Sequence, residues 1–303
     1  MNKGAFCFIA CLWVTVSSAA TENDTVYTPV VLWHGMGDTC CYPFSIGGLK
    51  SNIEKALPGI YVVSLKIGKN IVQDLENGYF MHPNKQVEFV CDQIKANSLL
   101  AEGFNAVGFS QGSQFLRALV QRCPEAKMKK LITLGGQHQG VYGLPDCAGL
   151  NSNTCDYIRR MLNHAAYYGF VQNNLVQATY WHDPLNEDMY KKYSTFLSDI
   201  NNELSINDTY RERLINLDKF AMVKFLNDTV VQPVESEWFG FYEPGQAKIV
   251  MDLRSSAIYE QDRLGLKQLD EQGKLDFIEV EGDHLQFSWP WFKKNIVDTY
   301  LSD

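Results

Sequence analysis

The sequence has no run of basic residues and, beyond its first twenty residues, no apolar run long enough to cross a membrane. Its formal net charge is −8, with 27 Lys and Arg against 35 Asp and Glu. Proteins that bind nucleic acid or anionic membranes carry basic patches, so this charge balance argues against both partners. Internal repeats and low-complexity segments are also absent. What remains is a chain of 303 residues, 46% of them hydrophobic, which is enough for one large globular domain or two small ones.

The first twenty residues differ from the rest. Lys3 supplies a positive start, Ala5 to Val16 form an apolar core, and Ser18-Ala19-Ala20 offer small residues for cleavage. This order predicts a secretory signal peptide over residues 1–20. An uncleaved anchor is the weaker interpretation, because the apolar core is too short to span a bilayer. We therefore expect a mature chain of residues 21–303 that enters the secretory pathway.

The sequence has few cysteines, and their number is even. Of eight cysteines, two (Cys7 and Cys11) lie in the predicted signal peptide, which leaves six: Cys40, Cys41, Cys91, Cys123, Cys147 and Cys155. An even number in a secreted chain predicts disulfides, and six cysteines allow fifteen pairings. Cys147 and Cys155 could close a short loop, whereas a bond between the adjacent Cys40 and Cys41 would form an unusual ring. A zinc site is weakly supported, since no pair has the two-to-four-residue spacing of zinc ligands.

Three Asn-x-Thr sequons follow the signal peptide, beginning at Asn23, Asn207 and Asn227. In a secreted protein such sequons predict N-glycosylation on surface loops. Together with the signal peptide and the cysteines, they predict the secretory route.

One short segment resembles a catalytic motif. Gly108-Phe109-Ser110-Gln111-Gly112 follows a β-like stretch, 104–107, and precedes a helical pattern, 114–121. A Gly-x-Ser-x-Gly between strand and helix is the nucleophile elbow of α/β-hydrolases. Glycine is needed on both sides because strand and helix approach each other closely there. The alternative is a glycine-rich turn that merely contains a serine.

Strand and helix patterns alternate through the first half of the chain, which predicts a doubly wound, mostly parallel sheet. The alternation then stops for about 85 residues between Leu134 and Ala221, where helical patterns and aromatic residues dominate. We expect a helical insertion at about residues 140–220 that acts as a lid or substrate-binding region. A helical decoration without substrate contact is the alternative. The predicted strands are 30–33, 60–65, 104–107, 130–134, 221–226, 246–252 and 275–280.

Two further residues complete a hydrolase triad in chain order. Asp228 follows the strand after the insertion, and His284 follows the last strand. The order Ser110, Asp228, His284 is that of α/β-hydrolases. A serine hydroxyl needs a base to take its proton, and the base needs a carboxylate to orient it. Asp283 is a rival acid, ranked lower because adjacent residues point in different directions.

The loop at His34-Gly35-Met36-Gly37 follows the first strand, where this fold places part of its oxyanion hole. We expect the backbone N–H groups of Met36 and Gln111 to be the two donors. His34 comes too early in the chain to be the triad base, so we expect a structural role for it.

These stretches resemble the lysosomal palmitoyl-protein thioesterase family. The matching segments cover nearly the whole predicted mature chain in order. They are Val31–Asp38 with Cys40-Cys41 just after, Asn105–Gly112, Gly135–Val141, Tyr180–Pro184, Val223–Asp228, Ser236–Tyr242, Gln261–Lys267 and Glu281–Gln286.

The resemblance implies hydrolysis of thioesters that join palmitate and other long-chain acyl groups to cysteines of proteins degraded in lysosomes. It implies the same triad and oxyanion donors and an acyl groove between body and insertion. We expect no cofactor and no metal, since no second histidine pairs with a carboxylate at helical spacing. The resemblance also implies the disulfides Cys40–Cys41, Cys91–Cys123 and Cys147–Cys155, and glycans at Asn207 and Asn227. One family sequon is absent at Lys192-Tyr193-Ser194, while Asn23 adds another.

Three functions remain in competition at this point: the thioesterase, an esterase, lipase or acyl-CoA thioesterase of the same fold, and a silent acyl-binding or partner-binding module. The presence of Ser, His and Asp together argues against the silent module. Thioester and oxygen-ester cleavage use the same groups, so only the resemblance favours the first function over the second.

Overall fold

The computed structural model describes residues 1, 26–143, 162 and 165–302. Residues 2–20 of the predicted signal peptide, Asn23, Cys147 and Cys155 lie outside these residues. A central sheet of six parallel strands has the order β2-β1-β3-β4-β5-β8. Its strands are β1 (Val30–Trp33), β2 (Val62–Ser64), β3 (Phe104–Phe109), β4 (Met128–Leu134), β5 (Lys219–Phe225) and β8 (Leu275–Val280).

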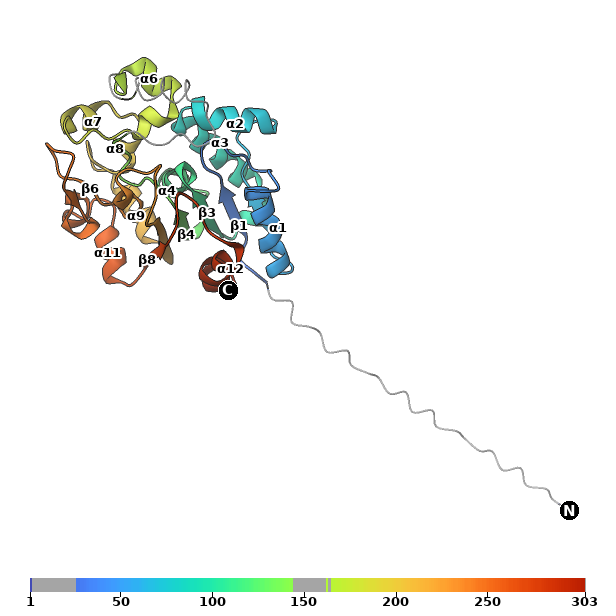
Figure 1. Ribbon diagram of the computed structural model, residues 1–303. Helices are drawn as coiled ribbons and strands as arrows, with labels where there is room; N and C mark the ends of the chain where they lie inside the picture. Colours follow the sequence, from blue (N-terminus) through green and yellow to red (C-terminus); the bar gives the residue numbers. More distant parts are fainter. Residues whose placement is uncertain (2–25, 144–161, 163–164, 303) are drawn as a thin grey trace.

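Helices cover both faces of this sheet (Figure 1). The body helices are α1 (Ile46–Ala56), α2 (Ile71–Phe80), α3 (Pro83–Ala96), η1 (Ser98–Leu100) and α4 (Gln111–Arg122). The C-terminal ones are η3 (Val234–Trp238), η4 (Leu253–Ser255), α10 (Ala257–Glu260), α11 (Leu266–Glu271), α12 (Trp289–Phe292) and the π-helix η5 (Lys293–Leu301).

The alternation of side chains along the strands explains the two layers. In β1, Val30 and Leu32 join one buried cluster with α1 and η5, while Val31 and Trp33 join the other with α3 and α4. Because both faces of β1 are buried, this strand reads as a continuous apolar run. The predicted doubly wound parallel sheet is confirmed.

The insertion between β4 and β5 is helical where the structure describes it. It contains α6 (Gly169–Asn174), η2 (Val176–Tyr180), α7 (Glu187–Tyr193), α8 (Leu197–Ile200) and α9 (Asp208–Ile215). In Figure 1, α6, α7 and α8 lie together at the end of the molecule opposite α12. No helix within the described residues is long and apolar enough to span a membrane.

One expected strand is wrong. The segment 246–252 does not join the central sheet, and only β7 (Val250–Met251) is extended, paired antiparallel with β6 (Phe241–Tyr242). Polar side chains at its ends bind the local backbone instead: Gln246 accepts N–H bonds from Lys248 and Ile249, and Asp252 caps η4 through the Ser255 N–H. These bonds favour turns over an extended strand.

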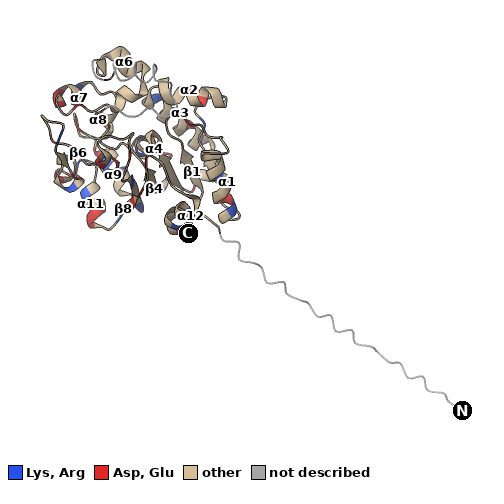
Figure 2. Ribbon diagram, in the orientation of Figure 1, with Lys and Arg blue, Asp and Glu red and all other residues tan. Residues whose placement is uncertain are grey.

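Charges of both signs are interspersed along the outer helices in Figure 2, for example on α1 and α11. In that view the blue segments of the ribbon are short and separated from one another.

Candidate active site

Ser110 occupies the sharp turn between β3 and α4. Its backbone has φ +52° and ψ −125°, in a region that non-glycine residues rarely adopt. The Ser110 N–H donates to the Leu134 carbonyl at 2.8 Å, which ties the turn to the neighbouring strand β4. Such strain persists only where surrounding structure imposes it, and it is typical of a nucleophile elbow.

The flanking glycines are required by close contacts. A Cβ at Gly108 would lie 2.6 Å from the Ser113 Cα, and one at Gly112 would lie 2.4 Å from the Trp33 carbonyl oxygen. Both distances are shorter than van der Waals contact to backbone atoms that cannot move aside. The expected reason for glycine on both sides of Ser110 therefore holds.

The structure brings Ser110, His284 and Asp228 into one hydrogen-bonded chain. His284 Nε2 lies 2.9 Å from Ser110 Oγ, and His284 Nδ1 lies 2.5 Å from Asp228 Oδ2. In this arrangement the Nδ1–H donates to the carboxylate, which leaves Nε2 free to accept the serine proton. The three residues are separated by up to 174 positions in the chain, and their meeting depends on the parallel sheet.

The Asp228 side chain is fully buried and held on several sides. Its Oδ1 accepts backbone N–H bonds from Val230 at 2.7 Å and Val231 at 2.8 Å. Burial by itself would raise the pKa of Asp228, but the hydrogen bonds from His284 and Glu237 bring it below its usual value. Asp228 therefore keeps its negative charge next to the imidazole.

Asp283, the rival acid, binds the backbone of the turn instead. It is exposed, and its Oδ1 accepts bonds from the Thr229 N–H, the Thr229 hydroxyl and the His284 backbone N–H, at 2.7–2.9 Å. These bonds lower the pKa of Asp283. Asp283 thus joins the loops that carry Asp228 and His284, while Asp228 contacts the imidazole ring.

The loop after β1 lies against the nucleophile. A Cβ at Gly35 would be 3.1 Å from the Ser110 Cβ, so the chain at Met36 passes beside the elbow. Gln111 is the first residue of α4, where backbone N–H groups lack helical partners. This geometry is compatible with the oxyanion hole expected from the N–H groups of Met36 and Gln111.

His34 and Asp74 form a buried pair that anchors this loop. His34 Nε2 lies 3.0 Å from Asp74 Oδ1, and Asp74 also accepts the N–H groups of Cys40 and Ile67 at 2.9 and 2.6 Å. Burial opposes charge on His34, but the bond to Asp74 and its negative charge raise the pKa of His34 overall. The Asp74 pKa is lowered despite burial, chiefly by the His34 hydrogen bond. His34 has the structural role expected for it.

Sequence reasoning missed three side chains close to the site. Gln137 donates to Ser110 Oγ at 3.0 Å, from the turn after β4. From the insertion, Tyr180 donates to the Gln111 side-chain carbonyl at 3.4 Å and Gln177 contacts the Met36 sulfur. Gln137 and Tyr180 lie in stretches that resemble the family, and Gln177 lies in the predicted insertion. The sequence gave none of the three an individual role. These contacts show that the insertion touches both residues expected to supply oxyanion donors.

The remaining described histidines have other partners. His82 binds Thr195, His138 binds Thr133, and His182 binds Glu187. None of these three bonds involves a residue of the triad.

A cavity of about 310 Å³ lies beside the loop that carries His284. Most of its lining residues are aromatic or aliphatic, and none of those within the described part of the chain comes from the insertion. Its lining residues include Phe44, Leu49, Phe109, Leu285, Phe287 and Trp289. The acyl groove expected between body and insertion therefore stays a prediction, separate from this cavity.

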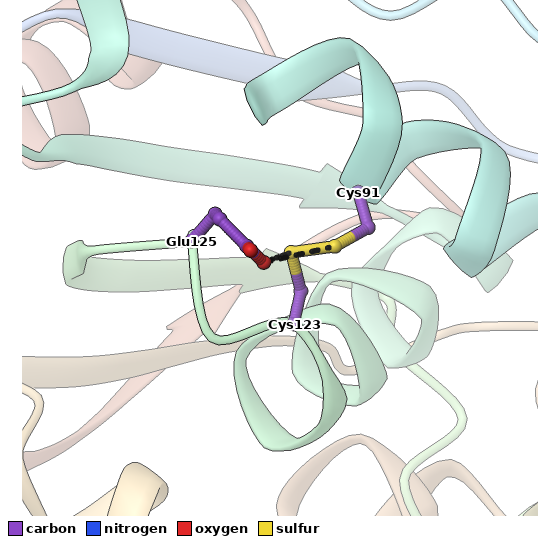
Figure 3. Close-up of side chains that lie close together, drawn as sticks. All are labelled: Cys91, Cys123 and Glu125. Carbon is purple, nitrogen blue, oxygen red and sulfur yellow. Dashed lines mark hydrogen bonds between the residues drawn. A yellow bond between two sulfur atoms is a disulfide. The ribbon is translucent and has the colours of Figure 1, made fainter. Parts of the chain in front are cut away.

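Two disulfides are present in the described residues, Cys40–Cys41 and Cys91–Cys123. The second joins α3 to the end of α4, with Glu125 beside its sulfur atoms (Figure 3). Because both sulfurs are in the disulfide, these three residues do not form a thiolate metal site. The pair Cys147–Cys155 lies outside the described residues.

Two predicted sequons can be placed. Asn207 caps α9 by accepting the Thr209 N–H at 3.1 Å, and Asn227 follows β5; both are exposed. Exposure is compatible with glycosylation, which remains a prediction for both asparagines.

Comparison with known proteins identifies the family. The palmitoyl protein thioesterase family model matches residues 29–284. Palmitoyl-protein thioesterase 1 of Caenorhabditis elegans is 45% identical over 98% of this chain and 99% of its own length. The chain belongs to the palmitoyl-protein thioesterase family.

Other relatives agree. Palmitoyl-protein thioesterase 3 of Dictyostelium discoideum is 35% identical over 84% of each chain. A lysosomal thioesterase PPT2 homolog of Drosophila melanogaster is 31% identical over 88% of this chain and 86% of its own. The family and the class of enzyme, a thioester hydrolase, predicted from the sequence are confirmed.

Proposed function

We propose that this palmitoyl-protein thioesterase family member removes palmitate and other long-chain acyl groups from cysteines of lipidated proteins during lysosomal degradation. The observation that carries the proposal is the hydrogen-bonded chain from Ser110 through His284 to Asp228 on a strained elbow. The family assignment supplies the thioester, because the triad by itself suits oxygen esters equally.

The first half of the reaction forms an acyl-enzyme. Ser110 Oγ attacks the thioester carbonyl while His284 Nε2 takes the hydroxyl proton, and Asp228 stabilises the imidazolium. The N–H groups of Met36 and Gln111 bind the oxyanion of the tetrahedral intermediate. As the intermediate collapses, the carbon–sulfur bond breaks, and His284 returns the proton to the departing cysteine sulfur.

The second half releases the fatty acid. Water attacks the Ser110 ester while His284 accepts one of its protons, and the oxyanion again forms at the same donors. Collapse then returns the proton to Ser110 Oγ. Every step uses side chains and backbone groups of this chain, with water as the only co-reactant.

The lysosomal setting rests on the resemblance and on the predicted signal peptide and sequons. A relative carries the word lysosomal in its name, and we extend that location to this chain. Substrates are then S-acylated proteins or peptides, with the insertion as part of the substrate-binding region, a proposal supported by its contacts to Met36 and Gln111.

A three-substrate comparison tests the function. Purified protein is assayed with a palmitoyl-cysteine peptide, palmitoyl-CoA and a triglyceride emulsion, alongside Ser110→Ala. We expect the highest kcat/KM for the peptide and no turnover by the variant. Preference for the triglyceride emulsion, with the peptide uncleaved, would contradict the proposed substrate class.

A further inference from the structure

Glu237 is a buried carboxyl group that the reaction described above does not use. It lies on the short helix η3, is 0% exposed, and packs against the end of β5. Its Oε2 accepts the Phe225 N–H at 2.9 Å, and its Oε1 accepts no hydrogen bond from any described residue. A buried carboxylate oxygen without a donor is costly, whereas a protonated oxygen can itself donate.

The neighbour of this carboxyl group is the acid of the proposed triad. Ligand atoms of Asp228, Glu237 and His284 all lie within 4.8 Å of one another. Two buried carboxyl groups this close cannot both be ionised without a large repulsion. One proton between them removes the repulsion and supplies a hydrogen bond.

The donors around the pair decide which group holds the proton. Asp228 accepts three N–H groups, from Val230, Val231 and His284, while Glu237 accepts only one. N–H donors stabilise the ionised form, so Asp228 is the anion and Glu237 the neutral acid. Burial and the nearby Asp228 raise the pKa of Glu237 well above its usual value, which also favours the neutral acid.

Among the described residues, Lys224 of β5 is a second charged group that acts on Glu237. Its Nζ lies 3.8 Å from the centre of the Trp238 ring and 3.6 Å from the Glu279 carboxylate. Lys224 is thus engaged with those two groups, and its charge does not take the place of the proton on Glu237.

We infer that Glu237 is a positioning residue: as a neutral acid it donates a hydrogen bond to Asp228 and holds that carboxylate against His284. The inference rests on the proposed function, since it assigns Asp228 and His284 to the triad. A neutral donor also withdraws charge from Asp228, so the imidazolium is held less tightly. Without Glu237, Asp228 would attract the imidazolium more strongly and oppose the steps in which His284 gives its proton away.

Two substitutions of Glu237 test whether its hydrogen bonds matter rather than its ability to ionise. Glu237→Gln keeps both bonds, because the amide oxygen accepts the Phe225 N–H and the amide N–H donates to Asp228. Glu237→Leu fills a similar volume and removes both. Glu235→Gln and Glu235→Leu are matched controls on the same helix, since Glu235 makes no contact with the triad in the hydrogen bonds described.

The readouts are kcat and KM for the palmitoyl-cysteine peptide from pH 4 to pH 8, with thermal unfolding of each variant. We expect Glu237→Gln to stay within about threefold of wild type at every pH, as do both controls. Glu237→Leu should lose about 10- to 100-fold in kcat, the value of a hydrogen bond to a charged group, with KM unchanged. The acid limb of the kcat–pH profile of Glu237→Leu should move to higher pH.

Infrared spectroscopy tests the protonation directly, even if the leucine variant does not fold. We expect a protonated-carboxyl C=O band in wild type at pH 7 that disappears in Glu237→Gln. If Glu237→Gln is as impaired as Glu237→Leu, or if the band is absent from the wild type, then Glu237 is not a neutral hydrogen-bond donor. If Glu237→Leu keeps wild-type kcat and pH profile, Glu237 has no positioning role.

Two further outcomes, a metal requirement and a failure of the proposed function, have different consequences for the inference. Activity lost on EDTA treatment and restored by a divalent cation would make these residues a metal site and overturn the inference. If the wild type does not cleave the peptide, the proposed function fails, whereas the infrared result still decides whether Glu237 holds the proton.

Discussion

Replacing Asp228 with asparagine should place the imidazole of His284 in the wrong tautomer while leaving the fold intact. Asp228 Oδ1 accepts the N–H groups of Val230 and Val231. The amide oxygen of asparagine takes over these two bonds, which turns its NH₂ group toward His284. The imidazole can then meet an N–H donor only with an unprotonated Nδ1, so its proton moves to Nε2, which faces Ser110.

The expected loss follows from this change of tautomer. In a serine protease the same substitution lowers kcat by about 10⁴, or about 5.5 kcal/mol in the activation free energy. We expect a similar loss for Asp228→Asn. Thermal stability should fall only modestly, because the asparagine oxygen keeps the two backbone N–H bonds while the charge-assisted bonds to the carboxylate are lost.

Asp283→Asn is the matched control in the same turn. Its three bonds all reach one oxygen, Oδ1, and an asparagine oxygen can accept all three. We expect less than about a tenfold loss in kcat. Both variants are assayed on the palmitoyl-cysteine peptide, with glycan occupancy at Asn227 compared, because that sequon includes Asp228. The reasoning is refuted if Asp283→Asn is crippling and Asp228→Asn stays within tenfold of wild type.

Three other predictions follow from the same contacts. Ser110→Ala should lower kcat by several orders of magnitude with folding unchanged; activity within tenfold of wild type would exclude Ser110 as nucleophile. Peptide mapping without reduction should join Cys91 to Cys123, and removing both should cost about 3–4 kcal/mol in unfolding free energy; free thiols would contradict this. Asp74→Asn should cost about 3–5 kcal/mol near pH 5. The His34–Asp74 pair is fully stabilising only above the usual carboxyl pKa and below the usual histidine pKa. The cost of Asp74→Asn should therefore shrink as pH rises through the raised pKa of His34. Equal costs in denaturant unfolding at pH 5 and pH 8 would refute the charged pair.

The parts of the fold that depend on local sequence could be predicted. Buried parallel strands are apolar throughout, and the elbow needs glycines at fixed positions, so β1, β3 and Ser110 are visible without a structure. The helix α2 was not predicted, because it begins at an asparagine cap, Asn70, rather than with a clear apolar period. The strand expected at residues 246–252 does not form as predicted, because Gln246 and Asp252 bind nearby backbone N–H groups and only β7 is extended.

The supporting groups of the site could not be predicted for a different reason. Glu237 and Asp74 are charged residues by type, and such residues are usually exposed. Their burial depends on partners far away in the chain: Asp74 meets His34 across 40 positions, and Glu237 reaches the Phe225 N–H at the end of β5. A sequence pattern gives the type of such a residue but carries no information about which distant donor will satisfy it.

The meeting of the three proposed catalytic residues could be predicted from the sequence because it depends mainly on the topology of the sheet. Ser110, Asp228 and His284 follow β3, β5 and β8, whose carboxyl ends lie along one edge of the sheet. The strand β4 lies between β3 and β5, so His284 must reach across its end. There Gly135, at φ +63°, leaves the space: a Cβ would lie 3.0 Å from His284 Cε1. The chain order of the three residues thus indicates where they lie along the sheet, and a glycine on the intervening strand end allows them to touch.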